Sequence, residues 1–389
     1  MKNFFKKIVV SILGFCATYI YNKHRPYIVA VTGSSGKTTT KYMIGELLKG
    51  SDKDVAVSKS NLNSQYGLPL VMLGYEKSPV NFWGWIAVVF LAPIRAISMK
   101  KCKKIMVLEY ASDRPGDLEY LTSIIPPDIA VITNIGVAHI EAFGSKEAIA
   151  REKWVLAQKA RDKVICAKKV EEISKTLPPI KADLVVAGYS KTAQALNIKS
   201  HKGFMEFDLL LFGKLQKSLK LKMLGIHNVD NFLLSILCAW AVSGEGAKLL
   251  SKIEKIEPLE GRGQRLVSKN GAVIIDESYN ANPASMIAAI GNLSNGSLGR
   301  RVIIMGEMKE LGNISKKAHQ EVALVAKKAA DYCVGVGGGF EGLGLDKWYP
   351  NVEQLIKDIE EIIKGDDTVL IKGSHSVGLE LAVKKIMEN

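Results

Sequence analysis

A glycine-rich loop between an apolar run and a helical pattern constrains this fold more than any other feature of the chain. The apolar run Tyr27–Val31 leads into Thr32-Gly-Ser-Ser-Gly-Lys-Thr-Thr-Thr40, and the pattern that follows predicts a helix over 37–49. A buried strand, a glycine turn and a helix N-terminus form the setting in which backbone N–H groups surround a phosphate. Val31 stands where the strict phosphate-loop pattern has its first glycine, so a plain strand-to-helix turn is the alternative.

Polar side chains follow two further predicted strands at the same edge of the expected sheet. The strand over 104–109 ends at Glu109, and the strand over 128–133 leads to His139. Ligands of open α/β sheets bind at the carboxyl ends of the strands, so both residues are candidate metal ligands beside the loop. A lone histidine is more often structural. Lys153, on the next predicted helix, has a solvated helix-face lysine as its plain interpretation.

Alternating apolar runs and helical patterns predict an α/β fold in two units. In the first unit, strands are predicted at 27–32, 104–109, 128–133 and 162–166, and helices at 37–49, 116–124 and 145–160. Residues 183–224 predict short β-strands around Gly213, and a helix follows from His227 to Val242. Pro258 and Gly261 place a boundary near 255–262. Beyond it, strands are predicted at 272–276, 301–305, 332–336 and 367–371.

Charge and cysteine content narrow the classes of partner. The 389 residues carry a formal net charge of +14, which suits nucleic acid, a membrane surface or anionic small substrates. No RNA-recognition signature, zinc-finger spacing or aromatic-basic platform is present, so nucleic acid is excluded as the expected partner. The five cysteines include no CxxC pair, which favours a reducing cytosol over a disulfide framework or a zinc site.

Two apolar segments indicate contact with a membrane. The first, Ile8–Tyr21, is flanked by lysines and is about 14 residues long, short of the roughly 20 that span a bilayer. The second, Val80–Ile97, carries Trp83 and Trp85 near its start and has several basic residues in its last part and just beyond. Apolar segments with interfacial aromatics and nearby lysines are typical of docking on an anionic membrane face. The alternative is that both segments pack against the globular body or a partner subunit.

A series of further motifs makes the chain similar to a known family. These motifs, which follow Thr32–Lys41, are Asn61-Leu-Asn63, Gly67-Leu-Pro69, Leu108-Glu109, Thr133-Asn-Ile-Gly-Val-Ala-His139, Lys153, Gly225-Ile-His-Asn-Val-Asp-Asn231, Gly261-Arg262, Asp276-Glu-Ser-Tyr-Asn-Ala-Asn-Pro283, Gly306-Glu-Met-Lys-Glu-Leu-Gly312, His319 and Lys372-Gly-Ser374. In order and spacing they resemble the Mur ligase family over about residues 27–389. Tyr279–Pro283 and Gly306–Gly312 resemble its D-alanyl-D-alanine-adding branch most closely.

The resemblance implies a fold and an activity. It implies a P-loop central domain with a mostly parallel sheet over 26–258 and a C-terminal Rossmann-like α/β domain over 259–389, after an apolar and basic segment at 1–25 that is a candidate membrane anchor. The activity is ATP-dependent amide bond formation with Mg²⁺. The γ-phosphoryl group passes to a substrate carboxylate, and the amine of an amino acid or dipeptide attacks the resulting acyl phosphate.

The resemblance also assigns roles to individual residues. The nucleotide-binding set is Gly33, Ser34, Ser35, Gly36, Lys37, Thr38, Thr39, Asn228, Asn231, Arg262 and Asp276. The catalytic set is Lys37, His139 and Lys153, and the metal set is Thr38, Glu109, His139 and a carbamylated Lys153. The substrate set is Asn61, Asn63, Tyr279, Asn280, Asn282, Lys372 and Ser374. For the second unit a helix cap and turn is the alternative, because Asn282-Pro283 is good helix-start chemistry.

The sequence departs from the family in three places. Family members carry a domain before the phosphate loop that grips a UDP-sugar carrier, whereas only about 26 residues precede the first strand here. We therefore expect either a partner chain that supplies this domain or an acceptor that is lipid- or polymer-linked. The Val80–Ile97 segment is longer than the family connection, and His375 stands where an arginine is expected.

Three functions follow as hypotheses. The first is a ligase of peptidoglycan precursor synthesis, in the cytoplasm at the inner face of the cell membrane. The second is a related amide ligase with another acceptor, as in poly-γ-glutamate synthesis. The third is a nucleotide-binding scaffold that has lost catalysis, against which the joint presence of Lys37, Glu109, His139 and Lys153 argues.

Overall fold

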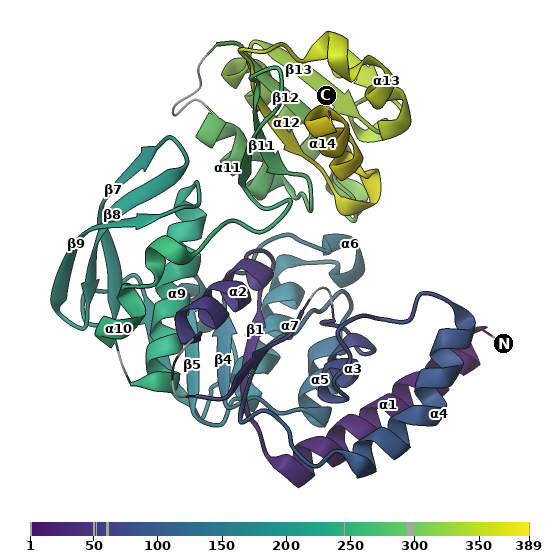
Figure 1. Ribbon diagram of the computed structural model, residues 1–389, viewed down its shortest axis with the longest axis vertical. Coiled ribbons are helices and arrows are strands. Elements are labelled where there is room, and N and C mark those ends of the chain that lie inside the picture. The colour runs from purple at the N-terminus through teal and green to yellow at the C-terminus, as the bar shows by residue number, and fades with distance from the viewer. Residues whose placement is uncertain are drawn as a thin grey trace.

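The computed structural model describes residues 2–49, 51, 53–59, 62–244, 246–293 and 299–388. It contains two α/β units joined near residue 260, with the C-terminal unit placed above the central one in Figure 1. The expected α/β class is confirmed. Most predicted strands and helices lie within one or two residues of their expected bounds.

The central unit is built on a parallel six-stranded sheet in the order β2-β3-β1-β4-β5-β6. Its strands are β1 (Tyr27–Thr32), β2 (Val55–Val57), β3 (Ile105–Glu109), β4 (Ile129–Ile132), β5 (Lys163–Ala167) and β6 (Asp183–Ala187). Parallel neighbours require crossover connections, which cover both faces of the sheet with helices. The continuous apolar runs of β1, β3 and β4 follow from this double burial.

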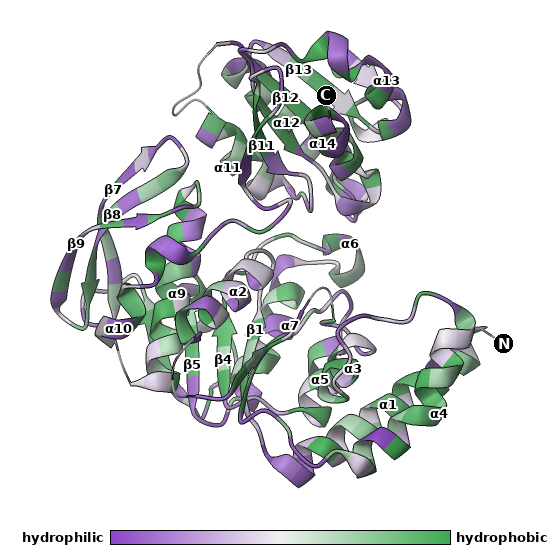
Figure 2. Ribbon diagram, in the orientation of Figure 1, coloured by the Kyte–Doolittle hydropathy of each residue, from purple (hydrophilic) through white to green (hydrophobic). Residues whose placement is uncertain are grey.

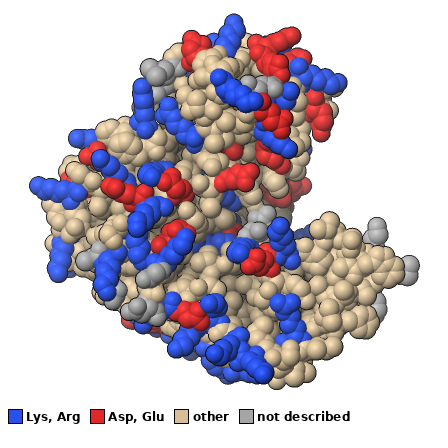
Figure 3. Space-filling model, in the orientation of Figure 1, with Lys and Arg blue, Asp and Glu red and all other residues tan. Residues whose placement is uncertain are grey.

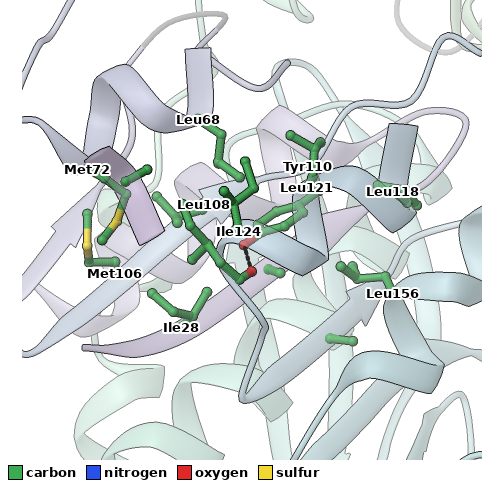
Figure 4. Packing of buried hydrophobic residues seen from close by; sticks show 14 of the residues in the cluster. Ile28, Leu68, Met72, Met106, Leu108, Tyr110, Leu118, Leu121, Ile124 and Leu156 are labelled. Carbon is green, nitrogen blue, oxygen red and sulfur yellow. Dashed lines mark hydrogen bonds between the residues drawn. The ribbon is translucent and has the colours of Figure 1, made fainter. Parts of the chain in front are cut away.

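Two hydrophobic layers flank this sheet. Residues of α2 (Lys37–Leu48) and α9 (Ile226–Ser243) pack on one face. On the other face lie α1 (Lys2–His24), α3 (Gly67–Met72), α5 (Asp117–Ile124) and α7 (Lys146–Lys159). Figure 4 shows the second layer, in which the buried hydroxyl of Tyr110 donates a hydrogen bond to the carbonyl of Ile125 at 2.6 Å. Short helices α6 (Ile140–Phe143), α8 (Lys168–Ser174) and α10 (Gly246–Leu250) complete the unit.

A separate antiparallel sheet follows the central sheet, as the pattern around Gly213 predicts. It comprises β7 (Ala193–His201), β8 (Phe204–Leu211) and β9 (Lys214–Leu221). Alternate residues of β8 are buried, because one face of this sheet packs on the layer formed by α2 and α9.

The C-terminal unit has a mixed six-stranded sheet in the order β10-β11-β15-β12-β13-β14. The strands are β10 (Gln264–Val267), β11 (Val273–Glu277), β12 (Arg301–Gly306), β13 (Tyr332–Val336), β14 (Lys347–Tyr349) and β15 (Thr368–Lys372). Only the β10–β11 pair within this sheet is antiparallel. Its helices are α11 (Pro283–Leu293), α12 (Ser315–Ala329), α13 (Val352–Ile362) and α14 (Leu379–Glu388), with short 3-10 turns at Gly312–Ile314, Gly338–Phe340 and His375–Val377. A further 3-10 turn, Ile253–Lys255, belongs to the central unit.

Both apolar segments form helices, and these helices lie side by side. The first is α1, which buries one face in the central core. The second is α4 (Phe82–Ser98), which runs parallel to α1, so that the Nζ of Lys23 reaches the carbonyls of Ile97 and Met99 at 2.9 Å each. Figure 2 shows both helices as mainly apolar. In the part of the chain that the structure describes, no helix combines the length and hydropathy needed to cross a bilayer.

Candidate active site

The glycine-rich loop lies between β1 and α2, as the sequence predicts. Gly36 precedes α2 with φ of 79°, a left-handed conformation that glycine adopts without strain. A Cβ atom at this position would lie 2.5 Å from Oδ1 of Asn231. Backbone dihedral and available space therefore both require glycine here, at the helix N-terminus where phosphates bind.

The segment after β4 fixes the conformation of the loop. The hydroxyl of Ser34 accepts a hydrogen bond from the N–H of Gly136 at 2.8 Å, and the N–H of Ser35 donates to Oδ1 of Asn134 at 2.8 Å. The hydroxyl of Thr133 donates to the carbonyl of Ser35 at 2.5 Å. The Ser34 hydroxyl and the main chain of Ser35 thus hold the loop in shape.

Glu109, at the end of β3, is the carboxylate nearest to the loop hydroxyl. It accepts hydrogen bonds from Oγ1 of Thr38 at 2.8 Å and from the amide of Asn63 at 2.9 Å. The Nζ of Lys41 lies 3.5 Å from Oε2 of Glu109, and both side chains are only 4% exposed. The structure therefore brings Thr38 and Glu109 together at the loop, and adds Lys41 and Asn63, a residue predicted for the substrate.

The surroundings of Glu109 keep it ionised. Burial opposes ionisation, but the positive charges of Lys37 and Lys41 hold the pKa of Glu109 below its ordinary value. Burial lowers the pKa of Lys37 and of Lys41, and Glu109 partly restores each. The Nζ of Lys37 donates to the carbonyl of Gly33 at 2.8 Å, which folds this side chain back over the loop.

Lys153 is buried rather than solvated. Its side chain on α7 is among the largest fully buried ones, at 1% exposure, and Nζ donates to the carbonyl of Ser112 at 3.0 Å. Burial and the charge of Lys37 lower the pKa of Lys153 to about 7. The amine is therefore largely neutral above pH 7, as reaction with carbon dioxide requires.

Glu152, next to Lys153, organises the loop after β3. Its carboxylate accepts hydrogen bonds from the hydroxyl of Ser112 at 3.1 Å, the N–H of Leu118 at 2.8 Å and the N–H of Gly116 at 2.9 Å. The loop carbonyl that receives the Lys153 amine is thereby fixed. The charge of Glu152 also acts on the neighbouring Lys153 and raises its pKa, against the larger effect of burial.

His139 connects the central unit with the C-terminal unit. Its Nδ1 contacts the carboxylate of Glu310, and its Nε2 lies 3.5 Å from Oδ1 of Asp113. His139 and Glu310 both have positive φ, at 59° and 63°, and such conformations are strained in residues with a side chain. His139, the predicted metal ligand, thus lies at the junction of the two units, where it contacts Glu310 and Asp113 rather than Glu109.

Arg262 forms a second link between the units. Its Nη2 donates to Oγ1 of Thr38 at 3.1 Å, and its guanidinium lies 4.0 Å from the centre of the Tyr279 ring. Tyr279 in turn stacks on the ring of His375 at 5.3 Å. The C-terminal unit therefore reaches the phosphate loop through Arg262, whose contact with the nucleotide stays a prediction.

The predicted amine-side residues form a polar group at the carboxyl ends of β11 and β15. The Nζ of Lys372 binds Oε2 of Glu277 at 2.8 Å and the carbonyl of Asn280 at 2.9 Å. The hydroxyl of Ser374 accepts from the N–H of Lys309 at 3.0 Å. Burial raises the pKa of Glu277, but Lys372 and His227 outweigh it and leave that pKa lowered.

The remaining predicted residues have structural contacts. Asn228 and Asn231 are buried on α9, 3.4 Å apart at their amides, and Asn231 faces Gly36. Thr39 is buried in α2, and Asp276 holds the N–H of Ser278 at 3.0 Å. Oδ1 of Asn282 accepts from the N–H of Ser285 at 2.9 Å at the start of α11, which is the helix cap considered as the alternative. Asn61 lies outside the described residues.

Four charged residues of the site were not predicted from the sequence. Lys41 occurs four residues after Lys37 in the helix, so the i, i+4 spacing was an available signal. Glu152, Glu277 and Glu310 had no such signal, because tertiary packing alone brings them to Ser112, Lys372 and His139.

The donors present fit a magnesium ion bound together with phosphates. Mg²⁺ in nucleotide sites takes one or two carboxylates, with phosphate oxygens and water completing the shell. Glu109, ionised and in contact with the Thr38 hydroxyl, provides such a carboxylate at the loop. Within the described ranges, no group of three or more His, Cys, Asp or Glu side chains could hold a metal by itself.

Comparison with known proteins agrees with this geometry. Residues 31–85 and 90–239 match the Mur ligase middle domain, and residues 261–375 match the Mur ligase, glutamate ligase domain. The chain is 28% identical to the UDP-N-acetylmuramoyl-tripeptide–D-alanyl-D-alanine ligase of Bacillus subtilis, over 93% of this chain and 76% of that protein. It is 26% identical to the enzyme of the same name from Escherichia coli, over 97% and 80%.

Solved structures give the same result. The crystal structure of the MurF ligase from Thermotoga maritima in complex with ADP superimposes with a TM-score of 0.82 and 26% identity. The match covers 97% of this chain and 83% of that one. The chain therefore belongs to the Mur ligase family and is a MurF-like, ATP-dependent ligase.

Proposed function

We propose that this ligase joins the amine of an amino acid or dipeptide to a carboxylate of a cell-wall precursor. The observation that carries the proposal is the convergence at Thr38, where the phosphate loop, Glu109 of β3 and Arg262 of the second unit meet. A ligase that passes through an acyl phosphate needs cations around the transferred phosphoryl group and two substrates held in line. The junction between the two units offers both.

On the nucleotide side, the chain binds ATP with the main chain of the loop and with two cations, Lys37 and Arg262. The N-terminus of α2 faces the phosphates, and Lys37 moves from the Gly33 carbonyl to the β- and γ-phosphates. Arg262 neutralises charge from the opposite side. Glu109 and the Thr38 hydroxyl would hold Mg²⁺, which supplies electrophilic stabilisation of the phosphoryl group when bound.

On the acceptor side, Lys153 and His139 border the carboxylate. The neutral Lys153 amine can add carbon dioxide and release a proton, which gives a carbamate anion that would hold a second Mg²⁺. His139 orients the loop before α6 through Asp113 and Glu310. On the amine side, Lys372, Asn280 and Tyr279 form the polar group that positions the incoming nucleophile.

The relatives' names suggest the two substrates. D-alanyl-D-alanine is the amine component named for the Bacillus subtilis and Escherichia coli enzymes, and a UDP-N-acetylmuramoyl-tripeptide is the acceptor. We propose the same dipeptide and a muramoyl-peptide carboxylate for this chain. We also propose a cytoplasmic location in contact with the inner membrane face, in keeping with the use of ATP and the formal net charge of +14. A partner chain that completes acceptor binding stays a proposal.

The test is substrate-dependent release of ADP. Purified protein, ATP and Mg²⁺ are supplied with D-alanyl-D-alanine and a muramoyl-tripeptide acceptor, and the ligated product is followed by mass spectrometry. Lys37→Ala should abolish turnover, whereas Lys53→Ala, at an exposed lysine outside the site, should retain it. Unchanged turnover in the Lys37 variant would contradict the loop assignment.

A further inference from the structure

A large cavity connects the candidate active site with helix α1. It has a volume of about 1270 Å³. One wall carries Asp113, His139 and Glu310, the residues at the domain junction. The opposite wall is the N-terminal part of α1, with Lys6 and Lys7. None of the residues predicted to bind the nucleotide belongs to α1.

The α1 wall is positively charged. Lys6 and Lys7 are both exposed on this helix, and the first 25 residues contain no aspartate or glutamate. Arg114 adds a cation to the lining from the loop after β3, whereas Asp117 and Glu141 add carboxylates to it from outside α1. An acceptor with an anionic group would therefore find cations on the α1 side and the catalytic centre on the other side of the same cavity.

The outer side of the α1–α4 pair, defined as helices Lys2–His24 and Phe82–Ser98, is apolar. Trp83, Phe90 and Ile94 of α4 are 75%, 73% and 64% exposed, and Phe15 of α1 is 75% exposed. The inner face of α4 has Val88, Ala92 and Ala96 buried, with Trp85 and Val89 partly buried beside them. Figure 3 shows the pair as a protruding surface with few charged side chains. An area of this kind marks a site of interaction.

The positive charge around the α1–α4 pair favours an anionic membrane as the partner of this surface. Residues 77–108 contain no acid, and exposed Lys100, Lys101, Lys103 and Lys104 follow α4 directly. Lys6 and Lys7 lie near the other end of the pair, where the rings of Phe5 and Phe82 are 5.2 Å apart. An apolar helix surface with lysines near both ends is suited to an anionic bilayer, with its rings at headgroup level.

We propose that the cavity receives a membrane-carried acceptor whose phosphate or diphosphate group binds Lys6 and Lys7, while the α1–α4 pair docks on the anionic bilayer. The acceptor carboxylate then reaches His139 and Lys153 from the membrane side. This inference rests on the proposed ligase function for its chemistry. The binding site itself is independent of turnover, because no residue of the phosphate loop lines the α1 wall.

The first experiment measures binding without turnover. The full chain is sedimented with phosphatidylcholine vesicles, alone, with phosphatidylglycerol, or with a polyprenyl diphosphate at a few mole per cent. Phosphatidylglycerol should increase the bound fraction several-fold, and Phe90→Asp with Ile94→Asp should abolish binding. Leu324→Asp, at a 60% exposed leucine on α12, is the matched control and should bind normally. Equal binding of the α4 variant and the control would overturn the docking surface.

The second experiment separates the two sources of the diphosphate group. Acceptors with the same peptide are offered either on soluble UDP or on polyprenyl diphosphate in vesicles, and ADP release is measured. The vesicle acceptor should have a KM at least about tenfold lower. Lys6→Ala with Lys7→Ala should raise that KM about tenfold, the loss expected for a charged hydrogen bond, and leave the KM for ATP unchanged.

Lys384→Ala with Lys385→Ala, an adjacent pair on α14, is the matched control for charge and should change neither KM. A lower KM for the UDP acceptor, or an unchanged KM in the Lys6 and Lys7 variant, would overturn the proposal. Absence of ADP release with both acceptors would refute the ligase substrates instead. In that case the sedimentation experiment still tests the binding site. The additional vesicle binding caused by the polyprenyl diphosphate should be lost in the Lys6 and Lys7 variant, and its retention would overturn the site.

Discussion

The neutral state of Lys153 is the property of this site that can be tested most directly. Burial and the nearby charge of Lys37 lower its pKa to about 7. At pH 8 roughly nine tenths of such amines are neutral, compared with about 0.3% for a lysine with the ordinary pKa of 10.5. At a fixed pressure of carbon dioxide, carbamate formation at Lys153 should therefore exceed that of a surface lysine by a factor of about 300.

The assay is nuclear magnetic resonance of protein with ¹³C-labelled lysine Cε, titrated from pH 5 to 11. One Cε resonance, absent in Lys153→Arg, should titrate with a midpoint near 7. A carbamate signal from ¹³C-bicarbonate should vanish in the same variant. In Lys37→Met the midpoint should rise, because a positive neighbour is removed, while burial still keeps it below the ordinary value. A Lys153 resonance that titrates near pH 10 would refute the reasoning.

Three further predictions concern the contacts around the loop. Lys41→Met should lower the free energy of urea unfolding by about 3 kcal/mol, since it leaves Glu109 buried with one cation fewer. The control Lys49→Met removes a lysine from an exposed ion pair with the same 3.5 Å separation and should lower it by less than about 1 kcal/mol. Equal losses in the two variants would contradict the role of burial. Arg262→Ala should raise the KM for ATP about tenfold in a coupled ADP assay, because a charged contact to the phosphate site is lost, whereas an unchanged KM would separate Arg262 from the nucleotide. Glu310→Ala should loosen the two units, seen as a larger radius of gyration in small-angle X-ray scattering without nucleotide, and an unchanged radius would show that the His139 contact does not hold them together.

The pattern of apolar runs and turns was sufficient for most of the fold. Buried parallel strands require continuous apolar runs, and β1, β3 and β4 have them, so their ends could be placed to within a residue or two. Short edge strands such as β2 and β14, each of three residues, were not predicted. In three residues, the alternation of apolar and polar side chains that indicates a strand cannot be distinguished from a loop.

The site was predictable where strand ends determine position. Glu109 follows directly from the end of β3, and it meets Thr38 because β1 and β3 are adjacent and parallel. The burial of Lys153 could not be predicted, because a helical lysine on a surface and one under a loop have the same sequence pattern. Its depth depends on the loop after β3, which Glu152 holds over the amine through three hydrogen bonds.

The charges at the loop explain why the two units meet there. Lys37, Lys41 and Arg262 converge on a single buried carboxylate, Glu109, so the centre carries an excess of positive charge. Burial lowers the pKa values of Lys37 and Lys41 because it disfavours the charged amines, and repulsion by the positive charge of Arg262 lowers them further. A triphosphate supplies the negative charge that offsets this repulsion. Its binding therefore stabilises the contact between Arg262 and the loop, and a nucleotide with fewer phosphates should hold the two units together less firmly.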